Sequence, residues 1–249
     1  MGNAISKKET DHYCSSSFLL HDCLYHFDEQ SHTSIEDLEL PDSQDSHKLC
    51  RSMDNIISIR ECNAIIASSE EAGFKPALLN VGFGREVYSP ETRNSDRCII
   101  DDTTFAKTLF RRIQDMLPQT FKDEGRNQIW KLVGLNERMR ILKYEKGNSF
   151  APHFDGQFRR RNGTERSFLS VMIYLNSGGE GGSFEGGSTI FLSRNTLGHR
   201  SDVSRCTEYV PKSGSVLVFD HELLHEGALL KEGLKYAIRT DVMYRIEKV

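Results

Sequence analysis

The chain has 249 residues, which is long enough for one large domain or two small ones with a buried core. Its net charge of −4 argues against a protein that binds nucleic acid through bulk positive charge. No apolar run reaches the length of a transmembrane helix, and the N-terminal segment lacks the apolar stretch of a secretory signal. The six cysteines form no C-x-x-C pair, so they are expected to be reduced thiols in a cytoplasmic protein.

The extreme N-terminus, Met1-Gly2-Asn3-Ala4-Ile5-Ser6, fits the pattern for N-myristoylation at Gly2. Because one myristoyl chain binds a membrane weakly and reversibly, the pattern predicts at most a peripheral membrane contact. The alternative is a chance match. Residues 1–45 are polar and show neither helical nor strand periodicity, which predicts a mostly disordered leader before a folded domain at 46–249.

Two helices are predicted in the first half of this domain. Residues 58–61 have the form of a capping box, which predicts a helix that continues to Ala72. Asp101 or Asp102 can cap a second helix, which Pro118 ends. Its apolar residues recur at spacings of three and four: Phe105, Leu109, Ile113 and Met116.

The rest of the chain is rich in Ile, Val, Leu, Tyr and Phe, interrupted by Gly and Ser, which predicts strands. The predicted strands are 138–145, 167–176, 188–193, 207–210, 215–219 and 235–245. Helices followed by a run of strands indicate an α+β fold. A helical support at 46–135 is then expected to pack on one face of a β-sandwich or barrel formed by 136–249.

A candidate metal site begins at His153 and Asp155, which follow the first predicted strand. On an extended segment these two side chains point to the same side. A further candidate ligand is His225, which follows the predicted strand 215–219. Two histidines and one carboxylate leave positions open on the metal, which is typical of non-haem Fe(II) sites that bind a bidentate co-substrate and O₂.

A candidate binding residue for a dicarboxylate lies further along the chain. Lys235 comes ten residues after His225, and its cation could pair with the distal carboxylate of such a ligand. Arg239 shares one face of the same predicted strand and competes for this role.

Residues 138–245 resemble the prolyl 4-hydroxylase type of Fe(II)- and 2-oxoglutarate-dependent oxygenase. The matching segments occur in the family's order: Arg-Ile-Leu-Lys-Tyr at 140–144, Pro-His-Phe-Asp-Gly at 152–156, Met-Ile-Tyr-Leu-Asn at 172–176, Gly-Gly-Ser-Thr-Ile-Phe at 186–191, His225, and Gly-Leu-Lys at 233–235. The resemblance implies a double-stranded β-helix (jelly roll) core with supporting N-terminal helices. The helices before residue 138 fit the family only in outline.

The resemblance also implies a role for each matching residue. His153, Asp155 and His225 would ligate iron, and Lys235 would hold the C5 carboxylate of 2-oxoglutarate. Tyr174 would lie near that carboxylate, Tyr144 nearer the metal, and Thr189 in the pocket wall. For both tyrosines the alternative is an ordinary buried strand residue whose hydroxyl only needs some partner.

The implied reaction is hydroxylation of an unactivated C–H bond, with consumption of O₂ and release of succinate and CO₂. The cofactors implied are Fe(II), 2-oxoglutarate as co-substrate, and ascorbate. The expected substrate is a prolyl or other residue of a protein or peptide, with a small molecule as the alternative, and no nucleic acid is expected as a partner.

Two other functions remain open from the sequence. His221-Glu222-Leu223-Leu224-His225 is a literal H-E-x-x-H motif, which is typical of zinc hydrolases. That function needs the motif on a helix, whereas a predicted strand leads directly into it. In the oxygenase interpretation His221 is expected to be a solvated loop residue at the rim of the site. The third hypothesis is a non-catalytic binding module of the same fold.

Overall fold

The computed structural model describes residues 19–24, 33–80, 85–123, 127–194 and 206–247. Its helices are η1 (Leu20–Cys23), η2 (Ser43–Asp45), α1 (Ile59–Ala72), α2 (Thr103–Ile113) and η3 (Gln114–Met116). Its strands are β1 (Ile35–Asp37), β2 (Cys50–Met53), β3 (Lys75–Pro76), β4 (Leu79–Asn80), β5 (Glu86–Val87), β6 (Asp96–Asp101), β7 (Thr120–Asp123), β8 (Gln128–Leu135), β9 (Arg138–Glu145), β10 (Phe150–His153), β11 (Glu165–Tyr174), β12 (Phe184–Gly186), β13 (Thr189–Leu192), β14 (Cys206–Tyr209), β15 (Val216–Asp220), β16 (His225–Gly227) and β17 (Leu230–Ile246). The described chain is therefore mostly β-structure.

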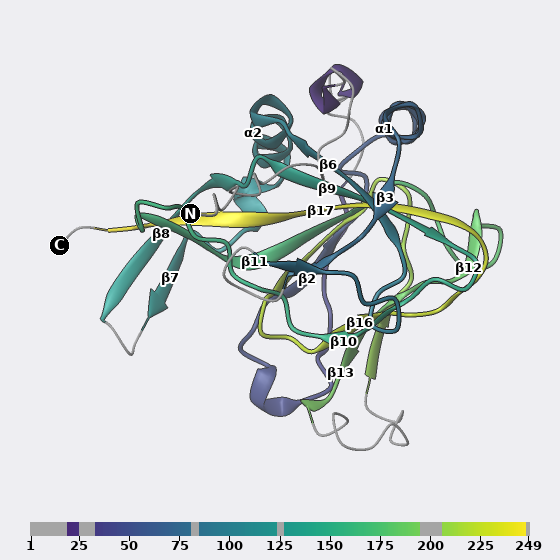
Figure 1. The fold of residues 1–249 in the computed structure, drawn as a ribbon. Helices are drawn as coiled ribbons and strands as arrows, with labels where there is room; N and C mark the ends of the chain where they lie inside the picture. The colour runs from purple at the N-terminus through teal and green to yellow at the C-terminus, as the bar shows by residue number, and fades with distance from the viewer. Residues whose placement is uncertain (1–18, 25–32, 81–84, 124–126, 195–205, 248–249) are drawn as a thin grey trace, which may run out of the picture.

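Two antiparallel sheets make up the body of the fold. The large sheet has the strand order β1-β2-β15-β11-β17-β9-β6-β3, and β8 and β12 also pair with β17. The small sheet has the order β10-β16-β13-β14. Figure 1 shows α1 and α2 on one side of the large sheet, with β10, β13 and β16 on the other side. This arrangement of two sheets is consistent with the jelly-roll core expected from the sequence.

Both predicted helices are present, and their caps explain where they begin. Ser58 accepts a hydrogen bond from the Glu61 amide, and the Glu61 carboxylate accepts one from the Ser58 amide, so the predicted capping box is confirmed. Asp102 caps α2 by accepting a hydrogen bond from the Phe105 amide.

Alternation along the strands divides the core between the two faces of the large sheet. In β15, Val216 and Val218 belong to the apolar cluster that packs against α1 and α2. The intervening Leu217 and Phe219 belong to a second cluster that includes Phe191 of the small sheet. Because side chains alternate with a period of two, each central strand contributes to both clusters. The second face, between the two sheets, is where the candidate site lies.

The N-terminal half differs from the sequence expectation in two respects. The expected leader at 1–45 is in part ordered, because Leu20 is fully buried in the core and β1 pairs with β2. The expected helical support at 46–135 also contributes strands to the large sheet, including β2 beside β15 and β6 beside β9. The described part of the chain is therefore mainly β, with two α-helices and three short 3-10 helices, so the expected α+β class is correct only in part.

Three further expectations concern lipidation, the cysteines and membrane-spanning helices. The predicted myristoylation site at Gly2 lies outside the described residues. The described cysteines, Cys23, Cys50, Cys62, Cys98 and Cys206, are all free thiols. None of the helices in the described ranges combines the length and apolar character needed to cross a membrane.

Candidate metal centre

The three predicted metal ligands come together at one point between the sheets. Antiparallel pairing of β10 with β16 places His153 opposite His225, and their ring centroids lie 4.3 Å apart. Asp155 follows directly after β10, with its carboxylate oxygens 3.9 Å from Nε2 of His153 and 3.8 Å from Nε2 of His225. One ligand atom from each of the three residues lies within 4.8 Å of the others, which is close enough for all three to hold one ion.

Both histidines are oriented by the backbone. Nδ1 of His153 donates to the Ala151 carbonyl at 2.8 Å, and Nδ1 of His225 donates to the Leu223 carbonyl at 3.0 Å. Since a carbonyl can only accept, the proton lies on Nδ1 and the lone pair of each Nε2 faces the other candidate ligands. Burial lowers the pKa of His153 to about 3, and burial also lowers the pKa of His225. Both rings are therefore neutral, as metal ligands must be.

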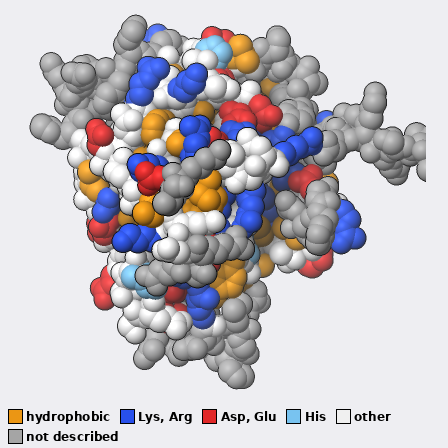
Figure 2. Space-filling model, turned by 90° about the vertical axis from the view of Figure 1, so that its left-hand side faces the viewer, with side chains coloured by type: hydrophobic (Ala, Val, Ile, Leu, Met, Phe, Trp, Pro, Cys, Tyr) orange, Lys and Arg blue, Asp and Glu red, His pale blue; other side chains and the backbone are white. Residues whose placement is uncertain are grey.

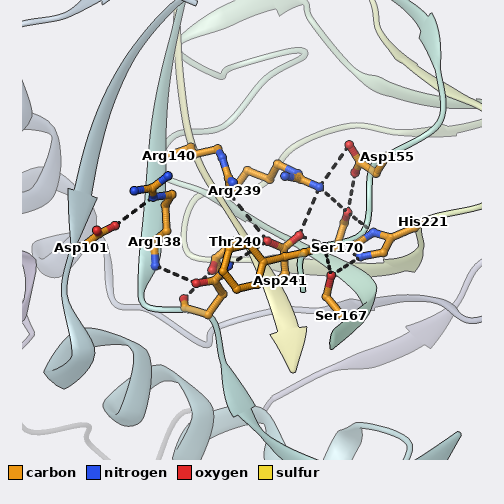
Figure 3. Close-up of polar contacts among 12 residues, drawn as sticks. Asp101, Arg138, Arg140, Asp155, Ser167, Ser170, His221, Arg239, Thr240 and Asp241 are labelled. Atoms are coloured by element: carbon orange, nitrogen blue, oxygen red, sulfur yellow. Dashed lines mark hydrogen bonds and ion pairs between the residues drawn. The ribbon is translucent and has the colours of Figure 1, made fainter. Parts of the chain in front are cut away.

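Asp155 is held in its ionised form by a network of polar side chains (Figure 3). Nη2 of Arg239 lies 3.2 Å from one carboxylate oxygen, and the Ser170 hydroxyl donates a short hydrogen bond to the other. Burial raises the pKa of Asp155, but its interactions with Arg239 and with the three nearby histidines together outweigh burial, so the net pKa is well below its usual value. The group is thus a carboxylate that is prepared to ligate a cation.

Lys235 lies in the same region and has a different environment. Its side chain is buried, and Nζ donates to the Gly187 carbonyl at 2.5 Å. The rings of Tyr144 and Tyr174 flank it, with centroids 5.2 Å and 5.5 Å from Nζ. Burial lowers its pKa to about 7. Among the residues that the structure describes, no carboxylate pairs with this amine, so an anionic ligand would supply its missing partner.

The competing cation, Arg239, already has partners of its own. It pairs with Asp155 and, at 3.2 Å, with Asp241 (Figure 3). These two carboxylates raise the pKa of Arg239 although burial lowers it. Because Arg239 already pairs with two carboxylates, Lys235 is the cation that remains available to a dicarboxylate.

The remaining predicted pocket residues surround Lys235. Tyr144 lies directly opposite Lys235 in the pairing of β9 with β17. The hydroxyls of Tyr174 and Thr189 are hydrogen-bonded to each other at 2.7 Å. Gly187, with φ of 67°, lets the chain turn between β12 and β13, and a Cβ there would lie only 2.7 Å from a Leu230 methyl group. The Gly-Gly-x-Thr segment thus presents the Gly187 carbonyl to Lys235.

A cavity of about 660 Å³ connects these groups. The large sheet contributes Tyr144 and Lys235 to its wall, and the small sheet contributes Thr189, His153 and His225. Apolar side chains such as those of Leu142, Met172 and Phe219 complete the wall. Figure 2 shows Lys and Arg side chains gathered around a hollow in the middle of one face, next to hydrophobic side chains.

The H-E-x-x-H motif does not form a zinc site in this fold. Residues 221–224 form a turn between β15 and β16, not a helix, so the two histidines do not share a helical face. The expectation that His221 is solvated is also wrong, because it is only 2% exposed. Its ring nitrogens are hydrogen-bonded to Ser167 at 2.8 Å and Ser170 at 3.0 Å (Figure 3). His221 thus supports Ser170, which in turn contacts Asp155.

Several residues of the site could not be identified from sequence motifs. Ser170 and Asp241 contact the site only because β11 pairs with β17, which places them directly opposite each other. The arginine-rich loop at 157–166 attracts attention in the sequence, yet Arg160 pairs with Glu137 and Arg166 with Asp123. The arginines that line the cavity lie elsewhere, and the alternation of charged and apolar residues in β9 is a sequence signal only for Arg138 and Arg140.

Comparison with known proteins shows which family part of the chain is similar to. Residues 139–240 match the 2OG-Fe(II) oxygenase superfamily. A probable prolyl 4-hydroxylase 3 from Arabidopsis thaliana is 23% identical over 203 residues, which cover 74% of this chain and 65% of the relative's own length.

Solved structures share the fold. A prolyl-4-hydroxylase from Pseudomonas putida superimposes with a TM-score of 0.51 and 17% identity, over 82% of this chain and 96% of that one. A prolyl hydroxylase from Trichoplax adhaerens, in complex with a peptide fragment of the hypoxia inducible factor oxygen degradation domain, gives a TM-score of 0.52 and 16% identity, over 79% and 83% of the two chains.

Proposed function

We propose that this chain, whose residues 139–240 belong to the 2OG-Fe(II) oxygenase superfamily, is an Fe(II)- and 2-oxoglutarate-dependent dioxygenase that hydroxylates an unactivated C–H bond. The proposed substrate is a prolyl or other residue of a protein, and a small molecule is the alternative. One observation carries the proposal: His153, Asp155 and His225 converge within 4.8 Å in the cavity that also contains the buried amine of Lys235.

The residues present fit both groups that this function requires. Two neutral imidazoles and one carboxylate form a ligand set that suits Fe(II) and leaves positions open for other ligands. Lys235, buried and without a carboxylate partner among the described residues, suits the C5 carboxylate of 2-oxoglutarate. Tyr144 and Thr189 line the same cavity and would contact the co-substrate there. Tyr174 would act indirectly, through its hydrogen bond to Thr189.

The chain would contribute orientation and exclusion of water. When bound, Fe(II) and 2-oxoglutarate supply the O₂-dependent oxidation of a C–H bond, with succinate and CO₂ as co-products. His153, Asp155 and His225 would fix the metal, and Lys235 would fix the far end of the co-substrate. Leu142, Met172 and Phe219 line the cavity and keep water away from the reacting centre. Ser170 and Arg239 hold the Asp155 carboxylate and restrict its rotation.

Three further assignments belong to the same proposal. The two facing sheets support a double-stranded β-helix for the core at 136–249. Ascorbate would keep the iron reduced. The sequence pattern at Gly2 supports N-myristoylation, which would bring an otherwise cytoplasmic enzyme to a membrane surface.

The function is tested with metal-free protein to which Fe(II), 2-oxoglutarate and ascorbate are added. Succinate is measured without any primary substrate, and Fe(II) binding is measured separately under anaerobic conditions. We expect succinate formation that requires Fe(II) and is abolished in His153→Ala, Asp155→Ala and His225→Ala. The control is His47→Ala, which removes an exposed histidine and should have no effect.

Two results would contradict the proposal. Zn(II) binding that is retained in His153→Ala but lost in His221→Ala, without succinate formation, would favour the hydrolase. Failure of the wild-type protein to bind both Fe(II) and 2-oxoglutarate would favour a non-catalytic module.

A further inference from the structure

Five arginines line the same cavity as Lys235. They are Arg93, Arg97, Arg138, Arg140 and Arg239. Strand pairing brings them together, because Arg239 of β17 lies opposite Arg140 of β9, and Arg97 of β6 lies opposite Leu142 of β9. Arg138, Arg140, Leu142 and Tyr144 alternate along β9 and therefore face the same side of the sheet. Carboxylates of the same wall neutralise two of the five arginines, since Arg97 pairs with Glu86 at 2.7 Å and Arg239 pairs with Asp155 and Asp241.

Two of these guanidinium groups are poorly neutralised within the described residues. Arg93 is 8% exposed, and the only polar partner found for it there is the Ser95 hydroxyl, 3.0 Å from Nε. Nη1 of Arg140 has no hydrogen bond to a described residue, and its nearest carboxylate, Asp241, is 3.6 Å away. Asp241 is also shared with Arg239, as Figure 3 shows. Buried positive charge without full pairing is costly, so a ligand that supplies negative charge would stabilise this region.

The mutual influence of the arginines supports the same conclusion. Burial lowers the pKa of Arg140 to about 10, with a further lowering by the charge of Arg239. Burial likewise lowers the pKa of Arg93, and Arg97 and Arg239 add to this effect. Arg97 and Arg239 therefore influence both residues, which indicates that the four cations form one cluster.

The co-substrate would not satisfy this cluster. In the proposed function its carboxylates interact with the metal and with Lys235. Four residues of extended strand separate Lys235 from Arg239, which corresponds to roughly 13 Å along β17. A second anion would supply the charge that Arg93 and Arg140 lack.

We propose that Arg93 and Arg140, flanked by the paired cations Arg97 and Arg239, form a subsite for an anionic group, a carboxylate or a phosphate, carried by the primary substrate. The inference rests on the proposed function in one respect: the proposed function identifies the bound molecule as the substrate. The planar guanidinium groups suit bidentate recognition of an oxyanion, and the position beside Asp155 would orient the substrate's reacting C–H towards the metal site.

The test uses small probes that need no knowledge of the substrate. The protein is loaded with Mn(II) and saturated with 2-oxoglutarate, so that Lys235 is occupied. Malonate, inorganic phosphate and neutral malonamide are then titrated by calorimetry. We expect one of the two anions to bind with a stoichiometry of one, more weakly as NaCl is added, and malonamide not to bind. A preference for malonate would indicate a carboxylate group on the substrate, and a preference for phosphate would indicate a phosphorylated one.

Variants locate the site. Arg140→Gln and Arg93→Gln should each weaken anion binding by roughly tenfold or more, which is typical for the loss of a charge-assisted contact. Arg140→Lys keeps the charge and should retain part of the affinity. Arg161→Gln removes an exposed arginine of the loop after the metal ligands and should have no effect. Thermal unfolding of each variant verifies that it is folded.

The inference is overturned if neither anion binds, or if Arg140→Gln binds as tightly as the wild-type protein. Its failure can be distinguished from failure of the proposed function. Failure of the proposed function would appear as absence of 2-oxoglutarate binding. Anion binding to the arginines would then be measured in Lys235→Ala, which lacks the other cation of the cavity.

Discussion

Ser170 is the side chain whose exchange most directly tests how Asp155 is held. Its hydroxyl donates to the Asp155 carboxylate and also contacts His221. Ser170→Ala should weaken Fe(II) or Mn(II) binding by roughly tenfold to a hundredfold, as is usual when a partner of a metal ligand is lost. The measurement is the metal dissociation constant.

Ser167→Ala is the matched control, because Ser167 also contacts His221 but no contact between it and Asp155 is found. Equal losses in the two variants would show that the effect acts through His221 rather than through Asp155.

The charge of Lys235 provides a pH-dependent prediction. Its pKa is lowered to about 7 by burial, so the amine loses its proton as the pH rises through 7. A bound carboxylate favours the protonated amine, so binding of 2-oxoglutarate should take up a proton. The affinity should therefore be highest below pH 7 and fall by up to about tenfold per unit above it.

This trend is measured by calorimetric titration of the Mn(II)-loaded protein with 2-oxoglutarate. The titration is repeated at pH values about one unit apart, from about 6.5 to about 9. Lys235→Arg keeps its charge throughout and should remove the dependence. If Arg239 held the carboxylate instead, the wild-type affinity would also be independent of pH in this range.

The proximity of single residues could be predicted where they lie in one short segment or in a matching motif. His153 and Asp155 share an extended stretch, and His225 follows a strand that the sequence predicts. His221 was misjudged because its burial depends on Ser167 and Ser170 in a different strand. The cationic cluster was missed for the same reason, since its members meet only through strand pairing.

At the level of elements, the beginning of α1 is fixed by an ion pair as well as by its cap. Arg112 of α2 pairs with Glu61 at 2.7 Å, and both side chains are buried. Glu61→Ala would remove the cap partner and leave the Arg112 charge buried without its carboxylate. It should lower the free energy of unfolding by about 3–5 kcal/mol, measured by urea denaturation.

Glu71→Ala, at an exposed position of the same helix, serves as the control and should change stability by less than about 0.5 kcal/mol. A loss in Glu61→Ala as small as that of Glu71→Ala would show that the buried pair does not secure the helix.

The elements that the sequence predicted correctly carry strong local signals. The capping box defined α1, and long apolar alternation defined β9, whose observed bounds equal the predicted 138–145. Strands β2 and β10 were not predicted, because their sequences, Cys-Arg-Ser-Met and Phe-Ala-Pro-His, lack the β-branched residues and the alternation typical of strands. Their conformation is determined by neighbouring strands, which local sequence does not encode.

On the scale of the whole molecule, two buried histidines and one half-buried histidine make stability sensitive to acid. Burial lowers the pKa of His153 to about 3, of His221 to about 4, and of His225 in the same direction. In the unfolded chain each would titrate near about 6.5. Between these values the unfolded state binds more protons than the folded state, so stability is retained above pH 6.5 and lost as the pH falls.

For the metal-free protein each histidine should contribute a loss of about 1.4 kcal/mol per pH unit within this window. Urea denaturation at pH 7, 6 and 5 measures the slope. His47→Gln, which removes an exposed histidine, should leave the slope unchanged. A stability that is constant over this range would mean that the folded protein takes up these protons.

The extent of the folded unit was the least predictable feature of the whole molecule. Polar composition suggested a leader up to residue 45, yet Leu20 is buried in the core and β1 extends the edge of the large sheet. One buried leucine and a three-residue strand give too weak a pattern to be recognised without the surfaces against which they pack.

Strand β17 has a consequence for how the length of this chain can vary. It is paired with β9 from Leu234 to Arg239 and, on its other edge, with β11 from Ala237 to Arg245. One inserted residue between Lys235 and Arg239 would turn the Arg239 side chain to the opposite face, into the apolar layer beneath the helices. Length changes are therefore excluded between these two cations, whereas the exposed turn at residues 161–163 can accommodate them without moving either cation.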